Sequence, residues 1–339
     1  MSVSQALSQR DGQPPLKVLI VKLSSLGDVV HAMPAVMDIQ TALPNVQIDW
    51  VVERGFATLA ARCAAVNRVI PCDIRRWRKS PLGAETRAQW CAFRDDLQTQ
   101  AYDAVIDLQG LTKSAWVSWL AKLTPTGRRY AMANQTDGSG YERPSRWVAD
   151  VAITLPAHIH AMTRSRALCS KIFEYTYRDK PDFGLGHAQP SKPPCVVLVH
   201  GTSRADKEWP ADRWVALGQR LQQEGFDLAL PHGSDVELAH SQWLAQQLPG
   251  AQVWPRLSLD ALTHCMATCS GVVGVDSGLS HIAVALDLAH VQIYNFDTAW
   301  RTGPQGVAYQ RSVVDTQVPS VNAVWQAWQS CWQQHGAQL

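Results

Sequence analysis

Three short polar segments contain residues that could accept a proton or bind an anion, and each follows an apolar run. The first, Leu23–Asp28 (LSSLGD), ends on a glycine and an aspartate. Gly27 permits a tight turn, and Asp28 is predicted to open a helix. There it could be an N-cap that accepts free backbone amides, or it could be a general base. His31, one turn further on, is a second candidate for the base.

The second segment, His200–Pro210 (HGTSRADKEWP), offers groups that suit a diphosphate. Thr202 and Ser203 supply hydroxyls, and Lys207 supplies a compact cation. The Gly-x-x-x-x-Gly-Lys spacing of a P-loop is missing, so a polar surface loop is the alternative.

The third segment, Asp276–His281 (DSGLSH), lies between an apolar strand pattern and a helical pattern. The backbone amides of Ser277, Gly278 and Leu279 would point out of the helix N-terminus, where they favour an anion. Asp276 could cap the same amides or bind a sugar hydroxyl, and His281 could be catalytic or structural.

A fourth segment, Ile74–Lys79 (IRRWRK), gathers four cations around one tryptophan: Arg75, Arg76, Arg78 and Lys79. Such a run can be a solvated face or a site for an anionic partner. Trp77 could stack on an RNA base. The rest of the chain predicts no basic groove, however, so we expect no nucleic-acid partner.

The elements that must position these segments alternate between strands and helices. Apolar runs predict four strands in each half of the chain, at Lys17–Lys22, Gln47–Val52, Ala104–Asp107 and Arg128–Ala131, then at Cys195–His200, Phe226–Leu230, Gly271–Val275 and Val291–Tyr294. Three- and four-residue spacing predicts helices between them, and a tryptophan-rich last helix over Val321–Gln334. This alternation predicts an α/β protein with parallel sheets.

A Gly- and Pro-rich stretch, Asp182–Pro194, separates the two halves. We predict a disordered tail over residues 1–16, an N-terminal domain over 17–185, a linker over 186–194, a C-terminal domain over 195–320 and a final helix over 321–339. Ligands of open α/β sheets bind beyond the carboxyl ends of the strands. Two doubly wound domains that face a central cleft would therefore bring these loops together.

The composition narrows the classes of function. The chain has 339 residues, a net charge of +2 and eight cysteines without a Cys-x-x-Cys pair. It has no apolar run of the ~20 residues that a membrane span needs, and its polar start indicates a cytoplasmic protein. The absence of Gly-x-Gly-x-x-Gly argues against a dehydrogenase. Because Asp-x-Asp is also absent, we expect Lys207 and the helix N-terminus to neutralise a leaving diphosphate without a metal.

Five stretches together resemble the ADP-heptose glycosyltransferase family, and within it the lipopolysaccharide heptosyltransferase I group. They are KVLIVKLSSLGDVVHAMPA, IRRWRK, YDAVIDLQGLTKSA, HGTSRADKEWP and VGVDSGLSHIAVALD, in that order over about residues 17–287. Heptosyltransferase II differs at the first loop, where it lacks the Ser-Ser pair.

The resemblance implies a GT-B fold, with two Rossmann-like domains, and an inverting, metal-independent transfer that uses no cofactor. The implied donor is ADP-L-glycero-β-D-manno-heptose, and the implied acceptor is a Kdo sugar of Kdo2-lipid A in the lipopolysaccharide inner core. The enzyme would be cytoplasmic and peripherally associated with the inner membrane.

The resemblance also assigns roles to single residues. It makes Asp28 the catalytic base. It implies that the donor is bound by Thr202, Ser203, Lys207, Asp235, Asp276, Ser277, Gly278, Leu279 and His281. It implies that the acceptor is bound by Ser25, Arg75, Arg76, Arg78 and Lys79. Two loops depart from the family pattern: in PHGSDVE, Asp235 is the match for the usual Glu, and Asn295–Pro304 (NFDTAWRTGP) replaces a Gly-Pro-Thr-Asp-Pro run.

Three alternatives remain open on the sequence. The chain could add the second heptose instead of the first. It could be a nucleotide-sugar epimerase of the same fold, which would not need the basic run. It could also be a non-catalytic nucleotide- or RNA-binding protein.

Overall fold

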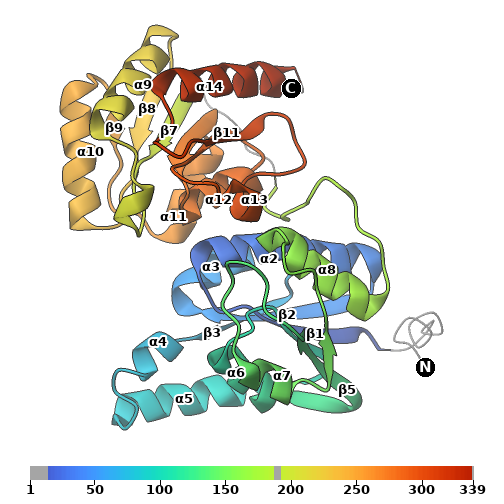
Figure 1. Cartoon of the computed structure of the whole chain (residues 1–339). Coiled ribbons are helices and arrows are strands. Elements are labelled where there is room, and N and C mark those ends of the chain that lie inside the picture. Colours follow the sequence, from blue (N-terminus) through green and yellow to red (C-terminus); the bar gives the residue numbers. More distant parts are fainter. Residues whose placement is uncertain (1–13, 187–191, 338–339) are drawn as a thin grey trace. The chain divides into compact units, whose positions relative to one another are not determined.

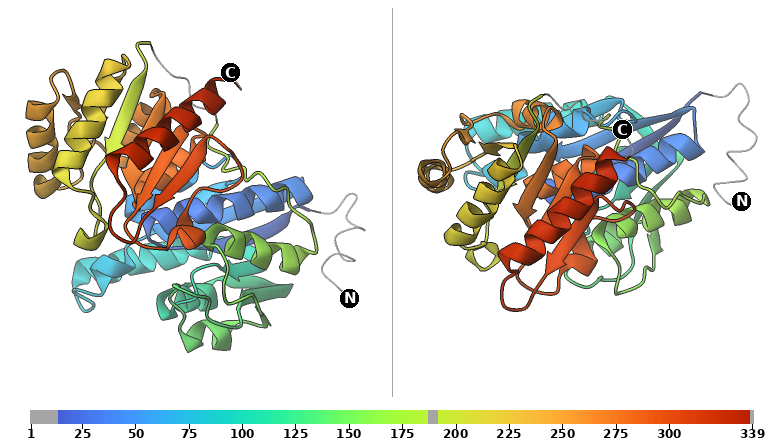
Figure 2. Two further views of the ribbon diagram at one scale, coloured as in Figure 1. Left: turned by 45° about the horizontal axis from the view of Figure 1, so that its top comes forward. Right: turned by 90° about the horizontal axis from the view of Figure 1, so that it is seen from above.

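The computed structural model describes residues 14–186 and 192–337 and divides the chain into two compact units (Figures 1 and 2). Unit 1 runs to Arg178 and includes Asp182–Gly184. Unit 2 comprises Asp179–Pro181 and the chain from Leu185 onward. Residues 1–13 of the predicted tail and 187–191 of the predicted linker lie outside the described residues. The division therefore falls slightly before the predicted linker.

Unit 1 is built on a six-stranded parallel sheet in the order β3-β2-β1-β4-β5-β6. Its strands are β1 (Leu16–Val21), β2 (Val46–Glu53), β3 (Arg68–Cys72), β4 (Ala101–Asp107), β5 (Lys122–Met132) and β6 (Val151–Ile153). Helices α2 (Leu26–Ala42), α3 (Ala57–Ala61) and α8 (Ala161–Phe173) cover one face, and α5 (Ala84–Leu97), α6 (Thr112–Leu120) and α7 (Arg143–Val148) cover the other (Figure 1). The short helix α4 (Ile74–Trp77) follows β3.

Unit 2 repeats this plan with a sheet in the order β12-β11-β10-β7-β8-β9. Its strands are β7 (Cys195–Val199), β8 (Asp227–Leu230), β9 (Gln252–Val253), β10 (Gly271–Val275), β11 (Ala289–Tyr294) and β12 (Gln310–Val314). Its helices are α9 (Ala211–Gln223), α10 (Asp235–Gln247), α11 (Leu259–Ala267), α12 (Gly278–Ala285), α13 (Ala299–Thr302) and α14 (Val321–Gly336).

In both sheets the strand order is that of a Rossmann fold, so the predicted doubly wound α/β class is confirmed. Each of the eight predicted strands is present. The sequence pattern missed β3, β6, β9 and β12, which lie at the sheet edges or are very short. An edge strand pairs on one side only, so its sequence need not be a continuous apolar run.

The last helix packs onto the sheet of unit 2, as its tryptophan spacing predicts. Trp328 is buried, and its ring meets Phe226 edge-on with the ring centroids 5.6 Å apart. Trp325 and Trp332 are partly buried against the same cluster. A Cβ on Gly271 of β10 would lie 2.5 Å from the Trp328 ring, so the helix approaches the strand closely at this glycine.

Each sheet has one point where the strand order reverses, between β1 and β4 in unit 1 and between β7 and β10 in unit 2. Ligands of such sheets bind at this point, beyond the carboxyl ends of the strands. The loops that follow these four strands contain Asp28, Gln109, Lys207 and Asp276. Among the described residues, no helix is both long and apolar enough to cross a membrane.

Candidate active site

Asp28 lies in the first turn of α2, as its third residue. The helix begins at Leu26 and has Ser25 at its N-cap position, so the prediction that Asp28 itself opens the helix as an N-cap is wrong. The Asp28 carboxylate reaches back instead and accepts hydrogen bonds from the backbone N–H of Ser25 (3.1 Å) and from its hydroxyl (2.9 Å). Ser25 and Asp28 therefore form one reciprocal turn at the carboxyl end of β1.

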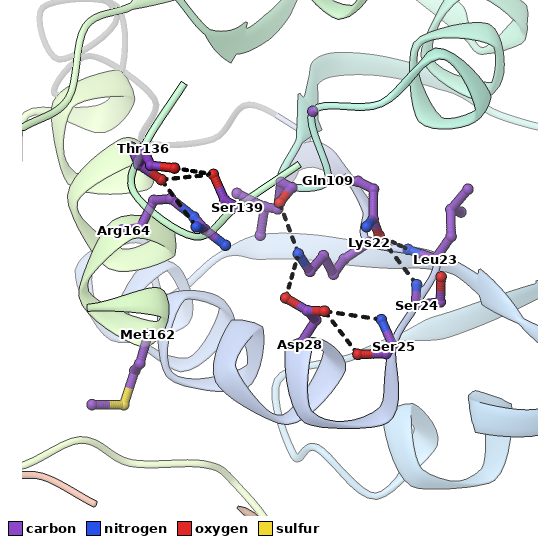
Figure 3. Close-up of polar contacts among 12 residues, drawn as sticks. Lys22, Leu23, Ser24, Ser25, Asp28, Gln109, Thr136, Ser139, Met162 and Arg164 are labelled. Atoms are coloured by element: carbon purple, nitrogen blue, oxygen red, sulfur yellow. Dashed lines mark hydrogen bonds and ion pairs between the residues drawn. The ribbon is translucent and has the colours of Figure 1, made fainter. Parts of the chain in front are cut away.

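Lys22 is the electrostatic partner of Asp28 (Figure 3). Its Nζ lies 3.4 Å from Asp28 Oδ1 and donates a hydrogen bond to the Leu108 carbonyl at 3.1 Å. The Lys22 side chain is 3% exposed and that of Asp28 is 36% exposed. Burial lowers the pKa of Lys22, and the charge of Asp28 opposes that shift. The sequence patterns do not single out Lys22, because it directly follows β1 and its contact with Asp28 depends on how the loop between the two residues folds.

The charge of Lys22 also sets the state of Asp28. Burial works to raise the pKa of Asp28, but the Lys22 charge and the two hydrogen bonds from Ser25 outweigh it. The pKa of Asp28 therefore lies well below the usual range of an aspartate. At neutral pH the carboxylate is ionised, which a group that is to accept a proton requires.

The loop after β4 fixes the loop after β1. Gln109 Oε1 accepts hydrogen bonds from the backbone N–H groups of Leu23 and Ser24, both at 3.1 Å. Lys113 Nζ donates to the Ser24 hydroxyl at 2.8 Å. Gln109 is itself held by Asp107, whose carboxylate accepts its backbone N–H at 2.8 Å. The amide of Gln109 thus joins the two loops at the reversal point of the sheet.

Two further buried groups lie around this site, Arg164 on α8 and His31 on α2. Arg164 is buried and donates from Nη1 to the Thr136 hydroxyl at 3.1 Å (Figure 3), and its charge helps to lower the pKa of Lys22. His31 is also buried, with its ring 5.6 Å from the ring of His160. His31 of α2 therefore packs against the start of α8.

The basic run follows β3 and forms α4 and the turn after it. Arg75, Arg76, Arg78 and Lys79 are all exposed, and Arg76 forms an ion pair with Glu85. Trp77 is buried against Trp90 and Phe93. The hypothesis that Trp77 stacks on an RNA base is therefore wrong, because its ring belongs to the core of unit 1.

In unit 2 the second and third predicted segments converge on Asp276. Lys207 Nζ lies 2.5 Å from Asp276 Oδ2, and both side chains are largely buried. The Thr202 hydroxyl lies 3.5 Å from the Asp276 carbonyl, and His281 Nε2 lies 3.6 Å from Asp276 Oδ1. The sequence leaves open whether Asp276 caps the helix. In the structure its carboxylate forms an ion pair with Lys207 instead.

Helix α12 begins directly beyond this ion pair. Ser277 occupies the N-cap position, and Gly278 and Leu279 are its first two helical residues. The Ser277 hydroxyl is buried and has no hydrogen-bond partner within the described part of the chain. A buried hydroxyl without a partner beside free helix amides indicates an anion-binding position. Ser203 is exposed on the facing loop.

Glu237, rather than Asp235, is the acid that faces the loops of unit 2. The side chain of Asp235 is 99% exposed, and its Oδ1 lies 4.0 Å from Arg256 Nη1. The Glu237 carboxylate accepts the backbone N–H of Gly233 at 2.6 Å. It also lies 2.8 Å from where a Cβ on Gly201 would be, so it borders the loop after β7. The sequence showed both acids in PHGSDVE, but only the helix phase decides which one turns inward.

The divergent loop after β11 supports the segment that carries Lys207. The Asn295 side-chain amide donates to the backbone carbonyls of Asp206 (3.0 Å) and Glu208 (2.9 Å). Asp297 of the same loop is exposed. Over residues 14–186 and 192–337, no group of three or more His, Cys, Asp or Glu side chains could hold a metal ion.

The family model of glycosyltransferase family 9 (heptosyltransferase) matches residues 90–324. The chain belongs to this family. Lipopolysaccharide heptosyltransferase 1 of Pseudomonas aeruginosa is 38% identical over 308 residues, which cover 88% of this chain and 83% of the relative.

Two solved structures of the Escherichia coli heptosyltransferase WaaC are also similar. WaaC with ADP is 35% identical with a TM-score of 0.84, over 93% of this chain and all of WaaC. WaaC with ADP-2-deoxy-2-fluoro heptose is 34% identical with a TM-score of 0.76, over 96% of this chain and all of WaaC. These findings confirm the heptosyltransferase resemblance and the GT-B fold class, and they make the chain a glycosyltransferase.

Proposed function

We propose that this chain transfers L-glycero-D-manno-heptose from ADP-heptose to a Kdo sugar of Kdo2-lipid A, with inversion at the anomeric carbon. The observation that carries the proposal is the arrangement of Lys207, Ser277 and the start of α12 at the reversal point of unit 2. It joins a cation, a buried free hydroxyl and helix amides at one place, which suits a diphosphate. The relatives named above support ADP-heptose as the donor.

The donor occupies unit 2 in this proposal. Lys207 exchanges part of its contact with Asp276 for the diphosphate, and the amides of Ser277 and Gly278 face the β-phosphate. Negative charge grows on this phosphate as its oxygen leaves the anomeric carbon, so fixed donors there lower the barrier. Since Lys207 supplies the cation, we propose that the transfer needs no divalent metal. Thr202, Ser203, Leu279 and His281 complete the site.

Glu237 is proposed to bind a ribose hydroxyl of the nucleotide. Its carboxylate borders the loops that follow β7 and β8. In Rossmann-type sheets an acid at this level commonly accepts the hydrogen bonds of a ribose. In this proposal Glu237 takes the role that the resemblance implies for Asp235.

The acceptor occupies unit 1, where Asp28 accepts the proton of the attacking Kdo hydroxyl. The new bond forms between this oxygen and the anomeric carbon, the bond from that carbon to the β-phosphate oxygen breaks, and ADP leaves. Lys22 holds the carboxylate ionised, and Ser25 fixes its direction. The exposed cations Arg75, Arg76, Arg78 and Lys79 would pair with phosphates and carboxylates of the acceptor.

Because this acceptor is a lipid, we propose that the protein works in the cytoplasm on the surface of the inner membrane. The family membership sets aside the epimerase and the non-catalytic alternatives. The Ser24–Ser25 pair and the high identity to a heptosyltransferase 1 favour transfer of the first heptose over the second.

The choice of acceptor can be tested directly. The purified protein should convert Kdo2-lipid A, and not the same lipid that already carries one heptose, when both are offered with ADP-heptose and the products are weighed by mass spectrometry. Product formed only from the heptosylated lipid would show that the chain adds the second heptose.

A further inference from the structure

Unit 1 carries three exposed tryptophans on two neighbouring helices, which we call the tryptophan face: Trp116, Trp119 and Trp147. Trp119 of α6 is 61% exposed, and Trp147 of α7 is 73% exposed. Trp116 is 41% exposed and stacks on Trp90 of α5, with the ring centroids 4.0 Å apart. Helices α5, α6 and α7 lie side by side on one face of the sheet (Figure 1). Large apolar side chains left in solvent on adjacent elements mark an interaction surface.

The segments that form the tryptophan face carry more cations than acids, although α5 adds three acids, Glu85, Asp95 and Asp96, each paired with an arginine. Residues 112–148 contain six Lys or Arg and only two acids, although the whole chain has a net charge of just +2. Both acids are already engaged: the Glu142 carboxylate accepts the backbone N–H of Thr112 at 2.6 Å, and Asp137 contacts His158 at 3.2 Å. Arg146, next to Trp147, is exposed, and so is Arg87, one turn before Trp90.

One of these cations also fixes the end of α6. The Arg129 guanidinium donates to the backbone carbonyls of Ser118 (2.8 Å), Trp119 (3.1 Å) and Ala121 (3.0 Å). These bonds satisfy carbonyls at the helix C-terminus, where a cation is favoured. Trp119 is therefore presented from a backbone that Arg129 holds in place.

We infer that the tryptophan face docks unit 1 onto an anionic lipid bilayer. Tryptophan prefers the headgroup level of a membrane, where its ring is buried and its N–H stays hydrated. Exposed Arg and Lys side chains beside it are attracted to anionic lipids. The excess of cations selects this occupant over an uncharged or basic protein surface. The inference rests on the proposed function in one respect: docking would bring the enzyme to its lipid-bound acceptor.

The test uses the full-length protein and two kinds of vesicle, one of phosphatidylethanolamine with phosphatidylglycerol and one of phosphatidylcholine alone. Trp119→Gln/Trp147→Gln should lower binding to the anionic vesicles by about tenfold or more in co-sedimentation, because apolar ring surface no longer leaves water. Arg87→Gln/Arg146→Gln should lower it by about fivefold per cation, and should weaken its dependence on salt. Trp243→Gln, at an exposed tryptophan on α10 of unit 2, is the matched control and should change nothing.

A second readout separates docking from catalysis. Transfer of heptose to an acceptor stripped of its acyl chains should be unchanged in Trp119→Gln/Trp147→Gln, whereas transfer to vesicle-bound Kdo2-lipid A should fall. Equal vesicle binding by wild type and variant, or no binding by wild type, would overturn the inference. A change of oligomeric state in the variant with vesicle binding intact would make the face a contact between copies instead. If wild type binds vesicles through this face but transfers no heptose, the proposed function fails and the docking surface stands.

Discussion

Replacing Asp28 by Asn tests the proposed base, because Asn keeps the size of the side chain and removes its capacity to take a proton. We expect kcat to fall by about 10²–10⁴-fold, the usual contribution of a positioned general base. The KM for ADP-heptose should change little, since Lys207 and the start of α12 belong to unit 2. Steady-state release of ADP, measured at saturating Kdo2-lipid A, gives both quantities.

The structure also predicts a loss of stability. In Asp28→Asn the new side chain can still accept a hydrogen bond from Ser25, but it leaves the Lys22 cation, 3% exposed, without its carboxylate. Loss of one partner from a buried pair costs about 3–5 kcal/mol, and an exposed pair is worth under about 1 kcal/mol. Asp28 is 36% exposed, so we expect the free energy of unfolding to fall by about 1–3 kcal/mol, which corresponds to a drop of about 2–10 °C in Tm. If Asp28 served only to cap the helix, Asp28→Asn would lose less free energy of unfolding.

Asp38→Asn is the matched control, because Asp38 lies on the same helix and forms a buried pair with Arg166 at 2.7 Å. It should also lower Tm, yet leave kcat nearly unchanged. The double variant Lys22→Met/Asp28→Asn should recover part of the lost stability and none of the rate. If Asp28→Asn keeps a near wild-type kcat, or if Asp38→Asn loses as much rate, then Asp28 is not the base.

Three further predictions concern unit 2. Lys207→Met should weaken ADP binding by about 10–100-fold in calorimetry, since a charge-assisted contact to phosphate is lost; unchanged affinity would place the diphosphate elsewhere. Glu237→Gln should weaken ADP binding, whereas Asp235→Asn should have no effect, because only Glu237 faces the loops; the reverse result would restore Asp235. Burial lowers the pKa of His200 to about 3 and of His290 to about 4, so the unfolded chain binds protons first as the pH falls below about 6.5. Stability should therefore decline from pH 7 to pH 5 by about 2 kcal/mol per histidine, and thermal melts of His290→Gln should show a flatter slope.

The sequence identified the loops of the site because their signals are local. A strand pattern followed by Gly-Asp or by Asp-Ser-Gly marks a strand end and a helix start wherever it occurs. The family resemblance then implies that these loops belong to one active site. Four strands escaped detection because their short or half-polar sequences pair only at edges.

The contacts between loops could not be read from the sequence, because they depend on strand order and helix phase. Lys22 ends the first predicted strand, and the strand pattern does not reveal that its cation pairs with the Asp28 carboxylate. Gln109 lies in the stretch YDAVIDLQGLTKSA, whose pattern does not reveal that its side chain joins two loops 85 residues apart in the sequence. Asp235 and Glu237 lie two residues apart on α10, so the rotation of the helix determines which of the two faces the loops.

Transfer of heptose from ADP-heptose to Kdo2-lipid A is the central claim, and one assay tests it most directly. Purified protein is incubated with ADP-heptose, with and without Kdo2-lipid A, and ADP release is followed together with the mass of the lipid. We expect rapid ADP release only when the lipid is present, with one heptose added per lipid. The claim would be contradicted if ADP were released at the same rate with and without the lipid, or if the lipid gained no heptose.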